Sequence, residues 1–162
     1  MVPPALTYRA RLRTEGLALA ACGAVGSVAL LLADARTTQN AGSTVGQLAV
    51  VLVLLGVLGP ISVRAAIARS QPGEGVGATG EPTPLWHLPL VVVVLAVPLV
   101  ALGAWDAALR VTGGCVLVGL AQALLLAGVV RSDERRTGRT YVRAPGSRIV
   151  RGTRLTHVQS RA

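Results

Sequence analysis

The sequence predicts an all-α protein: a four-transmembrane-helix bundle, arranged as two helical hairpins, with a disordered basic C-terminal tail. Hydrophobic residues make up 52% of the 162 residues, and the mean hydropathy is +0.60. They concentrate in four long stretches that hold no charged residue, and arginines stand near the ends of those stretches. A soluble helix of such length keeps a polar face, whereas a helix in lipid is apolar on all sides. We therefore expect a small polytopic membrane protein.

The stretch 85–105 predicts the clearest span. Its 21 residues carry no formal charge, and as a helix they would extend roughly 30 Å, the thickness of a bilayer's hydrocarbon core. Trp86 and Trp105 stand near its two ends, at the depth where indole rings favour the lipid headgroups. Pro98 in its interior predicts a kink, with a gating hinge as the alternative.

The first predicted span covers residues 17–33 and follows a cytoplasmic N-terminal arm, residues 1–16. Two processing sites compete with a retained helix: the lipobox-like residues 19–22, and residues 33–35, which have the A-x-A pattern of signal-peptidase cleavage. About six apolar residues precede Cys22, fewer than the roughly 7–15 of a signal peptide, and the apolar run continues beyond it. We therefore expect a retained membrane helix.

The second and fourth spans are predicted at residues 45–63 and 111–130, so that the membrane domain covers residues 17–130. Both stretches lack charged side chains and are long enough to cross a bilayer. Pro60 stands near the end of the second span and predicts a kink there, because its ring removes a backbone donor.

Three connections join these spans. Residues 34–44 form a polar, turn-rich segment, and residues 70–84 are rich in Gly and Pro, which predicts a flexible linker. The third connection is short and is expected at residues 106–110. Residues 112–114, Thr-Gly-Gly, are the alternative place for that turn.

Small residues recur at helical spacing in two spans and predict close helix packing. Ala18, Cys22 and Gly26 follow one another at four-residue intervals in the first span. Such stripes let two helices approach closely in lipid. Gln122 lies deep in the fourth span, where we expect an interhelical hydrogen bond; a substrate or ion site is the alternative. The predicted helix-packing residues are Cys22, Gly26, Cys115, Gly119, Gln122, Ala123 and Ala127.

The tail, residues 131–162, carries nine Arg against Asp133 and Glu134. A disordered segment is expected, with a weak hairpin over residues 141–150 as the alternative. Basic residues next to a membrane attract anionic lipid, whereas no aromatic interleaving or binding motif supports nucleic acid as a partner. The residues expected at the lipid surface are Arg131, Arg135, Arg136 and Arg139.

The distribution of arginine predicts the orientation. With four spans, 14 Arg fall on the side of the termini and two on the other, so the positive-inside rule places both termini in the cytoplasm. On this topology Cys22 lies in the inner half of the membrane and Cys115 near the outer edge. We therefore expect two free, buried thiols and no disulfide.

Groups that catalysis requires are scarce in this sequence. No span holds an acidic or basic residue in its interior, and the chain has two histidines, His87 and His157. Neither a metal site nor a cofactor site is expected from these residues. A further alternative combines His87 with Glu81 or Asp106 in an interfacial enzyme. We expect the protein not to be an enzyme.

The sequence favours a structural, accessory or scaffolding role in a prokaryotic cytoplasmic membrane. Membrane lipids are the expected partners, together with another membrane protein or a second copy of the chain, reached through the small-residue helix faces. The alternative is an oligomeric small transporter or channel, in which Gln122 and the kink at Pro98 line the path.

Overall fold

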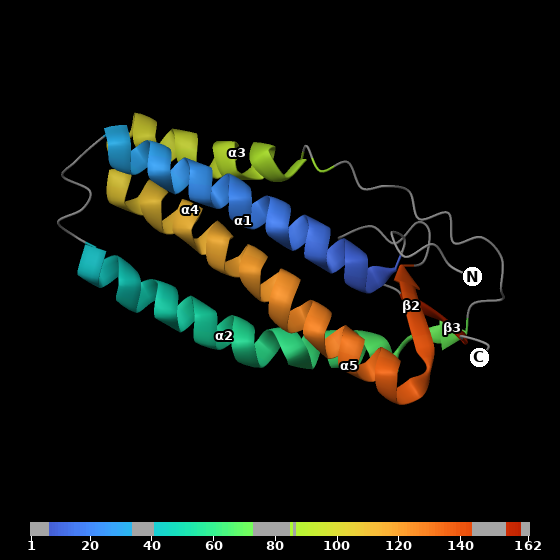
Figure 1. Cartoon of the computed structure of the whole chain (residues 1–162). Coiled ribbons are helices and arrows are strands. Elements are labelled where there is room, and N and C mark those ends of the chain that lie inside the picture. The colour runs from blue at the N-terminus through green and yellow to red at the C-terminus, as the bar shows by residue number, and fades with distance from the viewer. Residues whose placement is uncertain (1–6, 34–40, 73–84, 86, 144–154, 160–162) are drawn as a thin grey trace.

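Four apolar helices lie side by side in the computed structural model (Figure 1). The structure describes residues 7–33, 41–72, 85, 87–143 and 155–159. The prediction of an all-α bundle is confirmed. The helical elements are α1 (Tyr8–Ala33), α2 (Ala41–Ala68), α3 (His87–Ala101), α4 (Trp105–Leu120), the π-helical segment η3 (Ala121–Leu126) and α5 (Ala127–Thr137).

Three of the helices are long and apolar enough, by length and composition, to cross a membrane: Tyr8–Ala33, Ala49–Ala68 and Trp105–Thr137. The last is continuous through α4, η3 and α5. In the most apolar part of each helix, at most 28% of the residues are buried inside the protein. The exposed remainder is mainly Leu, Val and Ala, an apolar surface far larger than water tolerates. These are the helices of a membrane-embedded protein.

The fourth helix, α3, is shorter than the predicted span 85–105. Its 15 residues extend about 22 Å as an α-helix. Gly103 adopts a positive φ of 73° and ends the helix. The N–H of Gly103 donates to Val100 O at 2.9 Å, and that of Ala104 donates to Leu99 O at 2.8 Å, the paired bonds of a Schellman cap.

The predicted position of the connection between the third and fourth helices is therefore wrong. The turn lies at residues 102–104, and α4 begins at Trp105. Both predicted turn sites, residues 106–110 and 112–114, are helical. Gly113 and Gly114 stay in the helix because the chain has already reversed direction at Gly103, about ten residues earlier.

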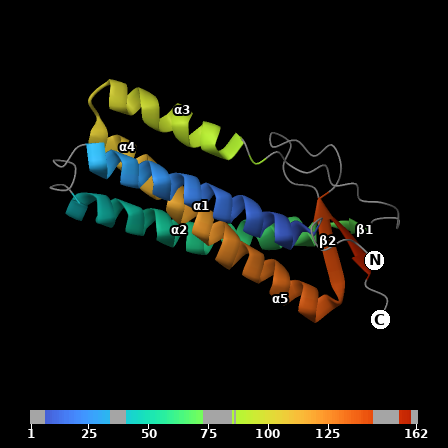
Figure 2. The ribbon, with the colours of Figure 1, turned by 45° about the horizontal axis from the view of Figure 1, so that its top comes forward.

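The helices are arranged around the long α4–η3–α5 helix. α1 packs along α4, and α3 contacts both of them, whereas α2 packs against α4, η3 and α5. α3 and α2 lie on opposite sides of the α1–α4 pair (Figures 1 and 2). The dominant helix pair is thus α1–α4 and does not follow the order of the chain. We call the end where α3 joins α4 the turn end.

A small sheet lies at the opposite end of the bundle, which we call the sheet end. Its strand order is β1 (Gln71–Pro72), β3 (Leu155–Gln159), β2 (Arg139–Arg143), with β1 parallel and β2 antiparallel to β3. Gly138, at φ 65°, ends α5 and lets the chain enter β2. The expectation of a disordered tail is wrong for these segments, because 131–137 is helical and two strands follow.

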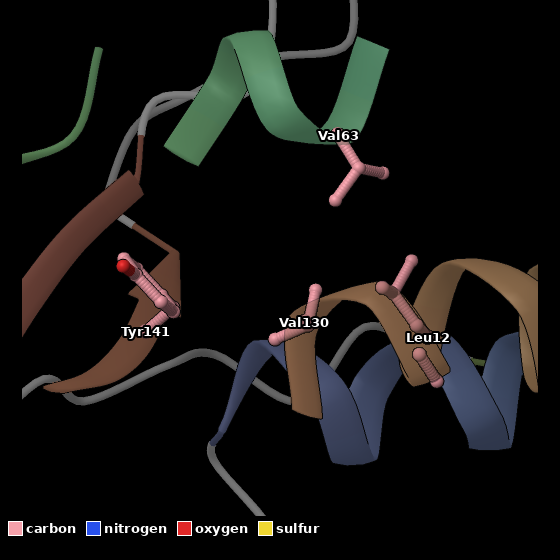
Figure 3. Packing of buried hydrophobic residues seen from close by; sticks show 5 residues of the cluster. Leu12, Val63, Val130 and Tyr141 are labelled. Carbon is pink, nitrogen blue, oxygen red and sulfur yellow. The ribbon is translucent and has the colours of Figure 1, made fainter. Parts of the chain in front are cut away.

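The hydrophobic core lies where the bundle meets the sheet. Leu12, Val63, Ala127, Val130 and Tyr141 are buried there and come from α1, α2, α5 and β2 (Figure 3). Farther from the sheet, the buried positions are mostly Gly and Ala. The chain therefore uses large side chains at the sheet end and close backbone contact within the apolar span.

Candidate functional site

Glycines bring the backbones of α1 and α4 into direct contact. A Cβ added at Gly16 would lie 2.5 Å from Gly119 O, and one added at Gly23 would lie 2.6 Å from Thr112 O. A Cβ at Gly119 would collide with Gly16 O and with the backbone N of Ala20. Real side chains cannot occupy these positions unless the helices separate. The close approach gives dense van der Waals packing, which drives helix association in lipid.

The structure places the predicted packing residues unequally. Gly119, Ala123 and Ala127 are buried, and Gly119 and Ala123 face α1. On α1 the buried small residues are Gly16, Ala20 and Gly23, a face adjacent to the predicted stripe. Gly26, from that stripe, also meets α4, because its Cβ would lie 3.1 Å from Thr112 Cγ2.

The two cysteines lie at similar heights along the bundle, which corrects the prediction of different depths. Gly23, the neighbour of Cys22, packs against Cys115: a Cβ added at Gly23 would lie 3.0 Å from Cys115 Cβ. Both thiols are free, as expected. The depth was wrong because the α3–α4 turn comes earlier in the chain, which moves Cys115 away from the turn end.

A hydrogen bond between Ser27 and Thr112 joins α1 to α4 inside the apolar region. Ser27 Oγ donates to Thr112 Oγ1 at 2.9 Å, and Thr112 Oγ1 donates to Leu109 O at 3.1 Å. Thr112 is the buried polar residue of the described core, 1% exposed. Sequence reasoning missed this pair. Ser27 next to the small-residue stripe was the available signal, but its partner depends on the helix register.

Gln122 and Pro98 are far apart. Gln122 lies half-buried in η3, and no hydrogen bond joins its side chain to another described residue. Gly26 marks one level of the bundle, because it faces both Thr112 and Val92. Pro98 is six residues beyond Val92 toward the turn end, and Gln122 is ten residues beyond Thr112 toward the sheet end. At 1.5 Å per residue they are about 24 Å apart along the bundle.

Polar side chains at the sheet end connect α1, α5 and β2. Tyr141 is buried and its hydroxyl donates to Asp133 Oδ2 at 2.5 Å. The backbone N–H of Tyr141 donates to Glu134 Oε1 at 3.4 Å, and Glu134 pairs with Arg9 at 3.4 Å. Burial raises the pKa of the Tyr141 hydroxyl, and its bond to Asp133 raises the pKa further. A neutral tyrosine thus holds the strand to the helix.

Ser70 and His157 form a second contact at this end. Ser70 Oγ lies 3.2 Å from His157 Nδ1, and the His157 ring meets the edge of Tyr141 with centroids 6.5 Å apart. In a hydrolytic triad a carboxylate orients the histidine, but here Asp133 accepts from Tyr141 instead. The pair joins the segment that precedes β1 to β3.

The other predicted chemical groups do not converge. His87 begins α3, whereas Asp106 lies in the first turn of α4, at the other end of α3. Glu81 lies outside the described residues. In the part of the chain that the structure describes, no three His, Cys, Asp or Glu residues gather in a way that could hold a metal ion.

Arginines crowd at the sheet end. Arg131, Arg135, Arg136 and Arg139, which the sequence assigns to a lipid surface, are exposed there. Of the described arginines, Arg110 belongs to the turn-end half of its helix, and the other ten lie at the sheet end: Arg9, Arg11, Arg13, Arg64, Arg69, Arg131, Arg135, Arg136, Arg139 and Arg143.

The described residues thus offer two kinds of functional surface. One is the apolar exterior of the helices, and the other is the arginine-rich sheet end. A function has to be inferred from these surfaces and from the contacts that support them. Comparison of the chain with models of protein families, with curated proteins and with solved structures finds no match.

Proposed function

We propose that the protein is a structural or accessory component of a prokaryotic cytoplasmic membrane, which packs through α2 against another membrane protein or a second copy. The observation that carries this proposal is the weak attachment of α2. In its most apolar 18 residues 6% are buried, compared with 22% in α1 and 28% in the α4–α5 helix. Within the bundle, α2 packs mainly against the α4–η3–α5 helix, and Val63 near its end joins the core at the sheet end.

The open face of α2 is continuous and apolar. A helix needs no partner to stay in lipid, but a face that also carries a glycine can admit a second helix at close range. Gly56 is exposed at the edge of this face, and nothing lies within 4 Å of a Cβ added there. The large exposed residues of this face are Val50, Val53, Leu54, Val57, Leu58 and Ile61.

The charges support a cytoplasmic sheet end. Ten of the eleven described arginines lie there, together with the acidic residues Glu15, Asp133 and Glu134, which leaves a net charge of +7 (10 − 3). Arginines near the ends of transmembrane helices remain on the cytoplasmic side. The sheet would then face the cytosol, where it is available to a soluble region of the same partner.

A photo-crosslinking amino acid at Val57 tests the partner surface. Val57 is 54% exposed on α2, and Val94, 59% exposed on α3, is the matched control. Irradiation of native membranes is expected to give one discrete protein adduct from position 57 and none from position 94. The same adduct partner should co-purify with the unmodified chain in mild detergent.

Two results contradict this proposal. One is the absence of a protein adduct from position 57 together with recovery of the chain only as a free monomer in mild detergent. The other is equal, diffuse crosslinking from positions 57 and 94, which would mean that lipid or random collisions cover both faces.

A further inference from the structure

A cavity opens between the start of α1 and the α5 helix, at the level where the apolar span ends. Its volume is about 250 Å³. Arg9, Arg13 and Arg131 line it together with apolar residues of η3 and α5. Arg9 and Arg13 are four residues apart and therefore project from one side of α1, whereas Arg131 comes from the opposite wall.

The charges of this cavity are incompletely balanced within the described chain. Arg9 pairs with Glu134 at 3.4 Å and keeps 40% of its side chain exposed. Arg13 and Arg131 are exposed, and neither forms an ion pair with a described residue. The three arginines and Glu134 leave a net charge of +2 (3 − 1). An anion placed between the helices would meet guanidinium groups from both sides.

The floor of the cavity is apolar and extends toward the middle of the bundle. Ala123, Leu124, Ala127 and Gly128 form it, and from Arg131 back to Ala123 the helix rises about 12 Å. Nothing lies within 4 Å of a Cβ added at Gly128, so the missing side chain leaves open depth there. Leu124 is 63% exposed along the same floor.

We infer that this cavity binds one anionic glycerophospholipid. The phosphate accepts hydrogen bonds from Arg9, Arg13 and Arg131, and an acyl chain lies along the floor past Gly128. A free phosphate ion would satisfy the arginines but would leave the floor uncovered, whereas a lipid matches both parts. The inference shares with the proposed function the placement of the sheet end at a membrane surface, and it does not depend on a protein partner.

Native mass spectrometry of the full chain, released from detergent, tests this site. Phosphatidylglycerol and phosphatidylcholine with identical acyl chains are titrated separately. The protein is expected to retain one phosphatidylglycerol under conditions in which phosphatidylcholine dissociates. Arg13→Gln and Arg131→Gln should each weaken retention about fivefold, because each removes one arginine near the headgroup. Arg135→Gln removes the same charge from α5 outside the cavity and should change retention little.

Gly128→Leu separates the lipid from a free anion. It keeps every arginine and fills open depth, so phosphatidylglycerol retention should fall while the melting temperature stays unchanged. Millimolar inorganic phosphate should not displace the lipid from the unmodified chain. Equal retention of the two lipids, an Arg135→Gln effect as large as that of Arg13→Gln, or displacement by phosphate would overturn the inference. A negative result leaves the crosslinking result at position 57 unaffected.

Discussion

Gly16 and Gly119 determine how closely α1 and α4 can approach, since each would meet the other's carbonyl oxygen if it carried a side chain. Glycine costs a helix about 1 kcal/mol relative to alanine, so its presence at the contact trades local helix stability for packing. Gly114, on the same helix, meets nothing within 4 Å of an added Cβ. The two positions therefore separate the packing effect from the propensity effect.

Gly119→Ala is expected to lower the free energy of unfolding by about 1–3 kcal/mol, because the added methyl group forces the helices apart. Gly114→Ala, the control, should leave it unchanged or raise it by up to about 1 kcal/mol. Reversible unfolding in mixed detergent micelles, followed by circular dichroism, measures both. Equal effects of the two substitutions would show that Gly119 does not lie at a tight contact.

Tyr141 makes the sheet end sensitive to alkaline pH. Its folded-state pKa is raised above the usual value by burial and by the bond to Asp133. A neutral hydroxyl therefore contributes stability that is fully present below the unfolded pKa of about 10 and is lost as pH rises through the folded pKa. Tyrosinate absorbance in the Tyr8→Phe variant, in which Tyr141 is the remaining tyrosine, should show a midpoint above 10.

Tyr141→Phe supplies the matched control, because it leaves Tyr8 to titrate. It also removes the bond to Asp133 without changing the ring, which should destabilise the protein by about 1 kcal/mol at neutral pH. A Tyr141 midpoint at or below 10 would mean that the hydroxyl is not held against the Asp133 carboxylate in the folded chain.

At the scale of the elements, the register between α1 and α4 depends on the pair Ser27 and Thr112. Their hydroxyl oxygens are 2.9 Å apart, so sulfur atoms at the same positions can approach bonding distance. In a chain with Cys22→Ala and Cys115→Ala, the double variant Ser27→Cys/Thr112→Cys should form an intramolecular disulfide on mild oxidation. The product is detected as a mobility shift in a non-reducing gel.

The control for this crosslink is Ser27→Cys/Gln122→Cys in the same background. Gln122 is ten residues further along the helix, about 15 Å away along the axis, beyond the reach of a disulfide. Crosslinking of position 27 to 122 in preference to 112 would contradict the register of the two helices.

The helices could be predicted because hydropathy is a local property of the sequence. The end of the third helix was harder to locate, since Gly103, Gly113 and Gly114 all offer a turn and only Gly103 adopts a positive φ. The packing face of α1 was placed on a neighbouring side of the helix because Ala and Gly occur on several of its sides. Which stripe is used depends on α4 and not on α1 alone.

The contacts at the sheet end could not be predicted, because they join segments far apart in the chain. β3 pairs with β1 in parallel and with β2 in antiparallel register, and no local pattern selects those partners. The π-helical turn that carries Gln122 could not be predicted either. It lies where Ala123 is in close contact with Gly16 of α1, a residue far away in the sequence. Among the described residues, Ser27 and Thr112 form an interhelical hydrogen bond, and the side chain of Gln122 forms none.

At the scale of the whole molecule, charged residues and large apolar side chains lie in different regions. Among the described residues, arginines gather at the sheet end, large apolar side chains cover the outside of α1, α2 and α3, and the turn end carries Asp106 and Arg110. Such a distribution suits a chain that crosses a bilayer with its sheet in the cytoplasm. In water the same apolar surface would drive aggregation.

Labelling of single cysteines tests this claim most directly. Three single-cysteine variants are made in the background without Cys22 and Cys115. Leu102→Cys reports on the turn end, Arg135→Cys reports on the sheet end, and Val57→Cys reports on the middle of α2. The side chain of Val57 is 54% exposed. With a membrane-impermeant maleimide, position 102 should react in intact cells, position 135 only after permeabilisation, and position 57 in neither case because it lies within the bilayer, away from water. Rapid reaction at position 57, at a rate like that of position 102, would contradict the account.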